Sequence, residues 1–111
     1  MSMIDQQHAL NLLGGNERIY LKFLQKFVDS ANAGKYTITS DIVQTDFEYA
    51  ARTFHAMKGL SENIGALSIK DIAFKLDEAA KNQNQALVLS NLDEYNTILD
   101  QVKQEAETIL H

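Results

Sequence analysis

The chain has 111 residues, 45% of them hydrophobic and 23% charged, which is typical of one soluble globular domain and excludes a disordered or fibrous chain. Cysteine is absent, so disulfides, thiolate metal sites and thiol catalysis are excluded. The net charge of −5 disfavours binding to nucleic acid or to anionic lipid, and the longest apolar run, residues 86–89, is far too short to span a membrane. We therefore expect a single cytoplasmic domain over residues 1–111.

Apolar residues recur at helical spacing along the chain, which predicts an all-α fold. A short first helix over residues 4–13 should end at Gly14 and Gly15, and Asn16 can then cap a second helix over residues 17–31. The apolar stripe of the second helix consists of Tyr20, Leu24, Phe27 and Ala31, with Phe23 beside it. We assign Phe23 to the core together with this stripe.

A polar connector follows, with one helical turn expected around residues 41–43. Either Ser40 or Thr45 can cap the third helix, which should run to about residue 63, before Gly65. Its apolar residues are spaced by alternating steps of three and four, as in a helix of an antiparallel bundle. They are Phe47, Ala50, Phe54, Met57, Ser61 and Ile64.

Two further helices complete the predicted fold. Ser68 can cap a fourth helix over residues 69–82, and a polar break at residues 82–85 precedes a fifth helix over residues 87–109. The fifth helix would be about 34 Å long, the length of a long bundle helix. We predict an all-α, antiparallel up-down four-helix bundle with a short additional N-terminal helix.

His55 is the most informative residue of the third helix. It points about 130° away from the apolar seam, so it should face solvent with Lys58 beside it. A neutral imidazole can attack an electrophile, and the Lys58 ammonium would stabilise a phosphoryl group at the ring. Gly59 stands where alanine would stabilise the helix by about 1 kcal/mol, and it leaves the approach to the imidazole open.

The segment from Ala51 to Ala66 resembles the signature of histidine-containing phosphotransfer (HPt) domains. That signature is His-x-x-Lys-Gly, followed by small residues and then by Asn-Ile/Leu-Gly-Ala. Here the matching residues are His55, Lys58, Gly59 and the run Asn63-Ile64-Gly65-Ala66. The similarity extends to residues 9–16, 20–27 and 76–81 and so covers most of the chain.

The resemblance implies a phosphorelay intermediate without an ATP site of its own. His55 would take a phosphoryl group from an aspartyl-phosphate of a response-regulator receiver domain and pass it to another receiver, with Lys58 stabilising the phosphoryl group and Gly59 giving clearance. The receiver would bring its own Mg²⁺, so no metal or cofactor is expected in this chain. The domain would be free-standing or part of a hybrid sensor kinase.

The resemblance also draws attention to Asp77. Family members often place a polar side chain against the second imidazole nitrogen, twenty-two positions after the histidine, and Asp77 stands there. A carboxylate at that point would fix the tautomer of the ring. A surface ion pair between Asp77 and Lys81, four residues apart, explains Asp77 equally well.

Among the remaining candidates, Ala51, Arg52 and Glu62 lie within about 60° of His55 on the helical wheel. Leu60 and Glu62 depart from the small residues usual in the family, and Glu62 would slow transfer, tune partner choice or pair with Lys58. Arg52 is placed to attract an acidic receiver pocket, although a solvated helix face also accounts for it. Ala51 is a candidate for an apolar docking ring. The other two histidines, at positions 8 and 111, lack partners at metal-ligand spacing and are predicted to be incidental.

Three functions are compatible with this pattern: a phosphoryl carrier, a non-catalytic helical module that docks receiver-like partners, and the phosphoacceptor segment of a sensor kinase. Such kinase segments resemble histidine followed by an acidic residue and soon by proline. Ala56 and Met57 follow His55 instead, and the chain has no proline. No glycine-rich P-loop is present, so ATP should not be a direct donor. We predict a monomeric phosphoryl carrier that contacts receiver domains transiently.

Overall fold

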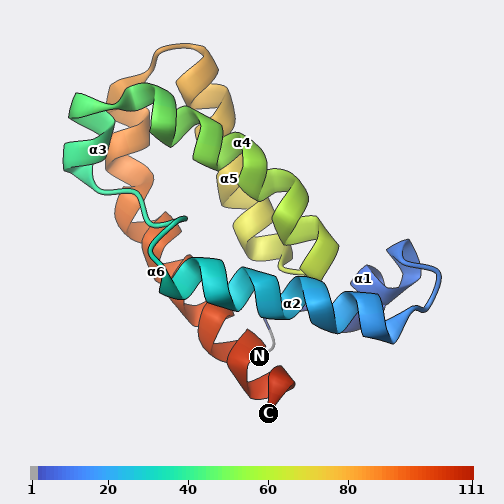
Figure 1. Cartoon of the computed structure of the whole chain (residues 1–111). Helices are drawn as coiled ribbons and strands as arrows, with labels where there is room; N and C mark the ends of the chain where they lie inside the picture. The colour runs from blue at the N-terminus through green and yellow to red at the C-terminus, as the bar shows by residue number, and fades with distance from the viewer. Residues whose placement is uncertain (1–2) are drawn as a thin grey trace.

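The computed structural model describes residues 3–111, which form six helices and no strand (Figure 1). The helices are α1 (Gln6–Leu12), α2 (Glu17–Asn32), α3 (Ser40–Thr45), α4 (Phe47–Ile64), α5 (Leu67–Lys81) and α6 (Gln85–Leu110). The all-α prediction and the short N-terminal helix are confirmed. The single turn expected in the connector is the short helix α3. Within the described residues, none of the helices is long and apolar enough to cross a membrane.

Side-chain caps lie at the start of every helix in the described residues except α5, and two of them bear on the predicted helix starts. Asn16 accepts a hydrogen bond from the Ile19 N–H at 3.1 Å, so the predicted start of α2 is confirmed. The start predicted for the next long helix, at Ser40 or Thr45, is wrong because those residues form α3. Asp46 separates α3 from α4, and its carboxylate accepts a hydrogen bond from the Tyr49 N–H at 3.2 Å. Helix α4 therefore begins at the next residue, Phe47.

The connection between α4 and α5 is shorter than predicted. Gly65 ends α4 with a φ of 81°, and the Ala66 N–H donates to the Ser61 carbonyl at 2.8 Å. The chain turns within residues 65–66, so α5 begins at Leu67 without a side-chain cap. Ser68 therefore lies inside the first turn of α5, and its predicted capping role is wrong.

The apolar stripes of the longer helices meet in one core. Helices α4, α5 and α6 reverse direction at each of their two short connections, while α2 packs across α6 and α4 (Figure 1). Phe54 and Tyr95 meet edge to face with ring centroids 5.3 Å apart. The largest fully buried side chains include Tyr20, Leu24, Phe54, Met57, Leu76 and Tyr95.

Phe23 is a correction to the predicted core. Its side chain is 38% exposed, whereas Phe27 on the same helix is buried. Phe23 lies about 60° around the helix from Tyr20, at the edge of the stripe. It borders a groove between α2 and α4 together with Leu60, so only part of the ring is covered.

The segment before α1 packs against the turn between α4 and α5. The Asp5 N–H donates to the Gly65 carbonyl at 2.8 Å, and a β-carbon added at Gly65 would lie 2.8 Å from the Asp5 carbonyl carbon. The Met3 and Ile4 N–H groups donate to the Glu105 carboxylate of α6 at 3.0 and 2.6 Å. The segment before α1 therefore links the turn between α4 and α5 to α6.

Candidate functional site

His55 lies on the solvent side of α4, with 66% of its side chain exposed. The helix forms because its buried residues recur every three or four positions and turn one face inward. That face contains Ala50, Thr53, Phe54, Met57, Ser61 and Ile64. The predicted exposure of His55 is therefore confirmed.

Asp77 of α5 lies against the inner side of the His55 ring. Its Oδ1 is 3.4 Å from His55 Nδ1, and only 2% of Asp77 is exposed. The short turn after α4 brings α5 back alongside it, so residues 22 positions apart meet. Of the two ring nitrogens, Nδ1 is therefore the one that faces the carboxylate. That Asp77 fixes the tautomer of the ring stays a prediction.

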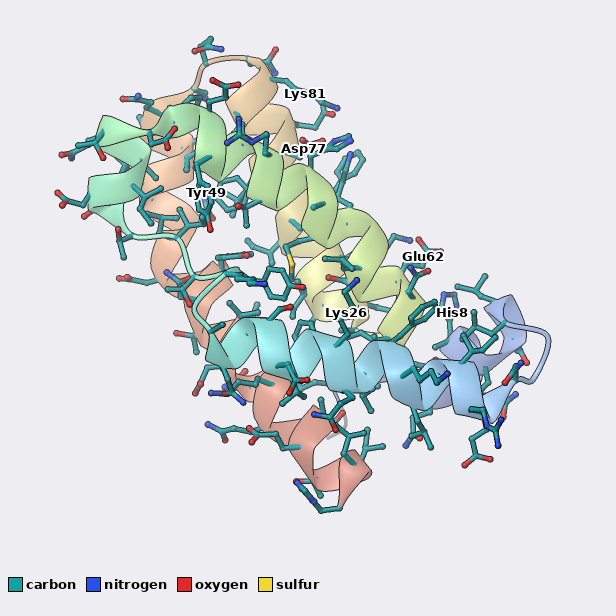
Figure 2. All side chains as sticks on the ribbon, in the orientation of Figure 1. His8, Lys26, Tyr49, Glu62, Asp77 and Lys81 are labelled. Carbon is teal, nitrogen blue, oxygen red and sulfur yellow. The ribbon has the colours of Figure 1, made fainter. Side chains whose placement is uncertain are left out.

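Two lysines share the other carboxylate oxygen of Asp77. Its Oδ2 lies 2.6 Å from Lys58 Nζ of α4 and 3.0 Å from Lys81 Nζ of α5, and Figure 2 shows Asp77 and Lys81 at this end of the bundle. Burial acts to raise the pKa of Asp77, but the hydrogen bonds and charges of the two lysines outweigh it, so this pKa is lowered. The hydrogen bond to Asp77 raises the pKa of Lys81.

Asp77 makes both of the contacts that we considered for it, so its role at the imidazole stays a prediction. It contacts both His55 and Lys81, and its pairing with Lys81 is not a surface ion pair because the carboxylate is buried. A buried carboxylate must be paired, and here its partners come from both helices. Asp77 thus joins α4 and α5 directly beneath His55.

Lys58 is held in place by two contacts. Besides Asp77, its Nζ lies 5.4 Å from the centroid of the Phe74 ring, within the range of a cation–π interaction. Phe74 lies on α5, one turn before Asp77, and is 56% exposed. Lys58 is therefore drawn toward α5 rather than extended into solvent, with 23% of its side chain exposed.

Glu62 does not pair with Lys58, so that expectation is wrong. Its Oε2 lies 3.0 Å from Lys70 Nζ of α5, and its Oε1 lies 3.8 Å from His8 Nε2 of α1. Figure 2 shows Glu62 and His8 near each other, at the end of α4 away from Asp77. The Lys58 ammonium is engaged with the buried carboxylate of Asp77, and Glu62 pairs with Lys70 of α5 instead.

Gly59 lies on the exposed side of α4, one turn beyond His55. A β-carbon added there would have no atom within 4 Å outside the adjacent backbone of its own helix. No packing contact among the described residues therefore explains glycine at this position. That Gly59 clears an approach to His55 stays a prediction.

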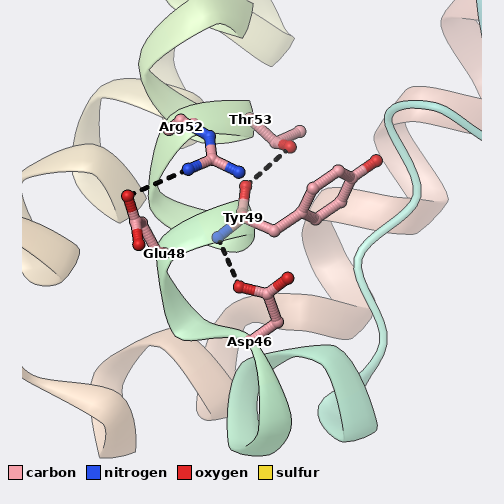
Figure 3. Close-up of polar contacts among 5 residues, drawn as sticks. All are labelled: Asp46, Glu48, Tyr49, Arg52 and Thr53. Atoms are coloured by element: carbon pink, nitrogen blue, oxygen red, sulfur yellow. Dashed lines mark hydrogen bonds and ion pairs between the residues drawn. The ribbon is translucent and has the colours of Figure 1, made fainter.

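Arg52 and Ala51 lie on the same side of α4 as His55. Arg52 Nη1 is 3.0 Å from the Glu48 carboxylate one turn earlier, and both side chains are largely exposed (Figure 3). A solvated helix face accounts for this pair, which contributes little to stability. Ala51 is half-buried, and its place in a docking ring stays a prediction.

The sequence did not identify two of the residues at this site. Lys81 was considered only as a surface partner of Asp77, and Phe74 was not singled out. A signal for Phe74 exists, since it is an aromatic residue outside the apolar stripe of α5. No sequence signal shows that Lys81 shares a carboxylate with Lys58, because that depends on the packing of α4 against α5.

Taken together, an exposed imidazole stands beside one buried carboxylate, whose second oxygen is paired with two ammonium groups. A nucleophilic nitrogen beside positive charge suits transfer of an anionic phosphoryl group. The family model of the Hpt domain matches residues 22–105. The chain belongs to the Hpt domain family. Comparisons with curated proteins and with solved structures gave no match.

The resemblance in residues 51–66 is thereby confirmed at the level of the family. Hpt domains are phosphocarrier modules without an ATP site, and they take part in histidine phosphotransfer in phosphorelays with receiver domains of response regulators. The matched part of this Hpt domain contains the whole cluster around Asp77, from His55 to Lys81.

Proposed function

We propose that this Hpt domain is a phosphorelay intermediate and that His55 Nε2 is its phosphoacceptor. The observation that carries the proposal is the exposed imidazole of His55, whose Nδ1 lies 3.4 Å from the buried carboxylate of Asp77. This contact holds the Nδ1 proton and leaves the Nε2 lone pair free for attack. The lysines on Asp77 provide positive charge next to the ring.

The transfer needs no metal held by this chain. The Nε2 lone pair attacks the phosphorus of an aspartyl-phosphate on a receiver domain, and an N–P bond forms as the bond from phosphorus to the aspartate oxygen breaks. The electron pair of that bond goes to the receiver carboxylate, and the Nδ1 proton stays on the ring, stabilised by Asp77. The reverse step delivers the phosphoryl group to the aspartate of another receiver. The receiver domains would supply Mg²⁺.

We further propose that residues 1–111 form one monomeric, cytoplasmic domain that contacts its receivers transiently and binds neither nucleic acid nor membrane. Whether the domain is free-standing or part of a hybrid sensor kinase does not change the chemistry at His55. A purified chain that elutes as a dimer in size-exclusion chromatography at micromolar concentration would contradict the monomer.

The test is transfer of labelled phosphate from a panel of phosphorylated receiver domains to the purified chain. We expect an acid-labile, base-stable phosphate on the wild type, none on His55→Gln, and normal labelling of the control His111→Gln, whose histidine is exposed at the end of α6. ATP alone should give no label. Label on His55→Gln would refute the assignment of the phosphoacceptor.

The competing function is a non-catalytic helical module that docks receiver-like partners through the same face. Its main support was the negative charge of Glu62, but that charge is paired with Lys70 at 3.0 Å. The two functions separate in the same experiment. A chain that binds receivers but takes up no phosphate from any of them would favour the non-catalytic module.

A further inference from the structure

The arrangement of cations around Asp77 has a consequence for the transfer step. Lys58 follows His55 by three residues on α4, yet its ammonium is engaged with Asp77 Oδ2 at 2.6 Å. To stabilise a phosphoryl group on His55, Lys58 must leave this contact or share it. Asp77 would then lose its closest partner while only 2% of it is exposed. A buried carboxylate without a partner is costly, which would oppose the movement of Lys58.

Lys81 removes this obstacle because it pairs with the same oxygen from a different helix. Its Nζ lies 3.0 Å from Asp77 Oδ2, and the two residues are one turn apart on α5. The pair therefore does not depend on where the Lys58 side chain points. The other acidic neighbour of Lys81 is Glu78, an exposed residue whose carboxylate lies 3.8 Å away, so the shorter contact is the one to Asp77.

We propose that Lys81 is a positioning residue for phosphotransfer, which keeps Asp77 paired while Lys58 moves from Asp77 to the phosphoryl group on His55. This inference rests on the proposed function of His55. Lys81 touches neither the imidazole nor the phosphoryl group, and it acts through Asp77. Its ammonium keeps the carboxylate ionised, so that Oδ1 continues to hold the proton on His55 Nδ1.

The experiment measures the rate of phosphoryl transfer from one labelled receiver to the wild type, Lys81→Met, Lys81→Arg and the control Lys103→Met. Lys103 suits the control because it pairs with Asp100 on α6, three residues away and outside the site. We expect Lys81→Met to be about three- to tenfold slower, the size expected for loss of one charge-assisted hydrogen bond at a half-exposed position. Lys81→Arg and Lys103→Met should transfer at rates near the wild type.

A second background separates action through Asp77 from a general effect of charge on docking. The side-chain amide of the Asp77→Asn variant is neutral and needs no cation, so adding Lys81→Met to Asp77→Asn should not slow transfer any further. The affinity of each variant for the unphosphorylated receiver should stay within about twofold of the wild type, since Lys81 is not proposed to contact the partner. Lys81→Gln serves in place of Lys81→Met if circular dichroism shows that the methionine variant is unfolded.

Two results would overturn the inference while leaving the proposed function intact. One is a Lys81→Met variant that transfers as fast as Lys103→Met. The other is an equal slowing by Lys81→Met in the wild-type and Asp77→Asn backgrounds, which would mean that Lys81 does not act through Asp77. Failure of the proposed function is distinct, because the wild type itself would then take up no label.

Discussion

Replacing Gly65 by alanine should destabilise the chain far more than the same change at Gly15. The two glycines have nearly equal φ values, 81° and 82°, so alanine would be placed in the left-handed region at both positions. The strain of that conformation costs about 1 kcal/mol. A β-carbon at Gly15 meets no atom within 4 Å, whereas one at Gly65 would overlap the backbone of Asp5.

The extra cost at Gly65 can be worked out from these contacts. The Asp5 backbone must move away from the added methyl group, which breaks the 2.8 Å hydrogen bond from the Asp5 N–H to the Gly65 carbonyl. Losing this bond costs about 1 kcal/mol, and repacking the segment before α1 costs about as much again. We therefore expect Gly65→Ala to lower the free energy of unfolding by about 3 kcal/mol, against about 1 kcal/mol for Gly15→Ala.

Urea denaturation followed by circular dichroism measures both values on the same scale. Because the slope with denaturant should be unchanged, the two variants can be compared through their midpoints. Equal losses in Gly65→Ala and Gly15→Ala would refute the reasoning, since the larger loss at Gly65 is expected from the overlap with Asp5.

Three further variants test the site and the bundle. Gly59→Ala should raise the free energy of unfolding by about 1 kcal/mol, because the added methyl group enters open space on a helix. The same variant should slow phosphoryl transfer to His55. An unchanged transfer rate would show that glycine is not needed to clear the approach to the imidazole. Asp77→Asn should lower the free energy of unfolding by about 2 kcal/mol near pH 7. Pairing with the two lysines outweighs burial and lowers the pKa of Asp77 in the folded chain. The difference in unfolding free energy between the wild type and Asp77→Asn should therefore shrink as the pH falls below about 4. Urea denaturation at several pH values measures this difference, and a constant value would contradict the pairing. Burial raises the pKa of Tyr20 from 10.0 to about 12, so the free energy of unfolding of the wild type should fall between those pH values. Tyr20→Phe should reduce that fall. Identical plots of unfolding free energy against pH for the two proteins would contradict the burial of the Tyr20 hydroxyl.

The sequence predicted helices well and their ends less well. Apolar spacing was sufficient for the long helices, because each one buries a continuous stripe, as α4 does through Phe54 and Met57. The ends depended on local competition. Asp46 displaced Thr45 as the cap of α4, and the tight turn at Gly65 left Ser68 inside α5. Phe23 was misplaced because a stripe has edges that spacing alone does not define.

The sequence likewise predicted some features of the site and missed others. The exposure of His55 followed from the helical angle alone, since it depends only on positions within α4. The contact with Asp77 came from the family resemblance, and the pairing of Lys58 with Asp77 rather than with Glu62 came only from the packed structure. Spacing on one helix cannot rank a partner four residues away against a buried carboxylate on another helix.

All the polar groups that surround the imidazole lie on a single helical hairpin, α4 and α5 with their two-residue turn. The other helices contribute the apolar cover beneath it. The hairpin should therefore be transplantable: grafted onto an unrelated helical scaffold with matching hydrophobic stripes, residues 47–81 would bring the histidine, its carboxylate and both ammonium groups along in their native register.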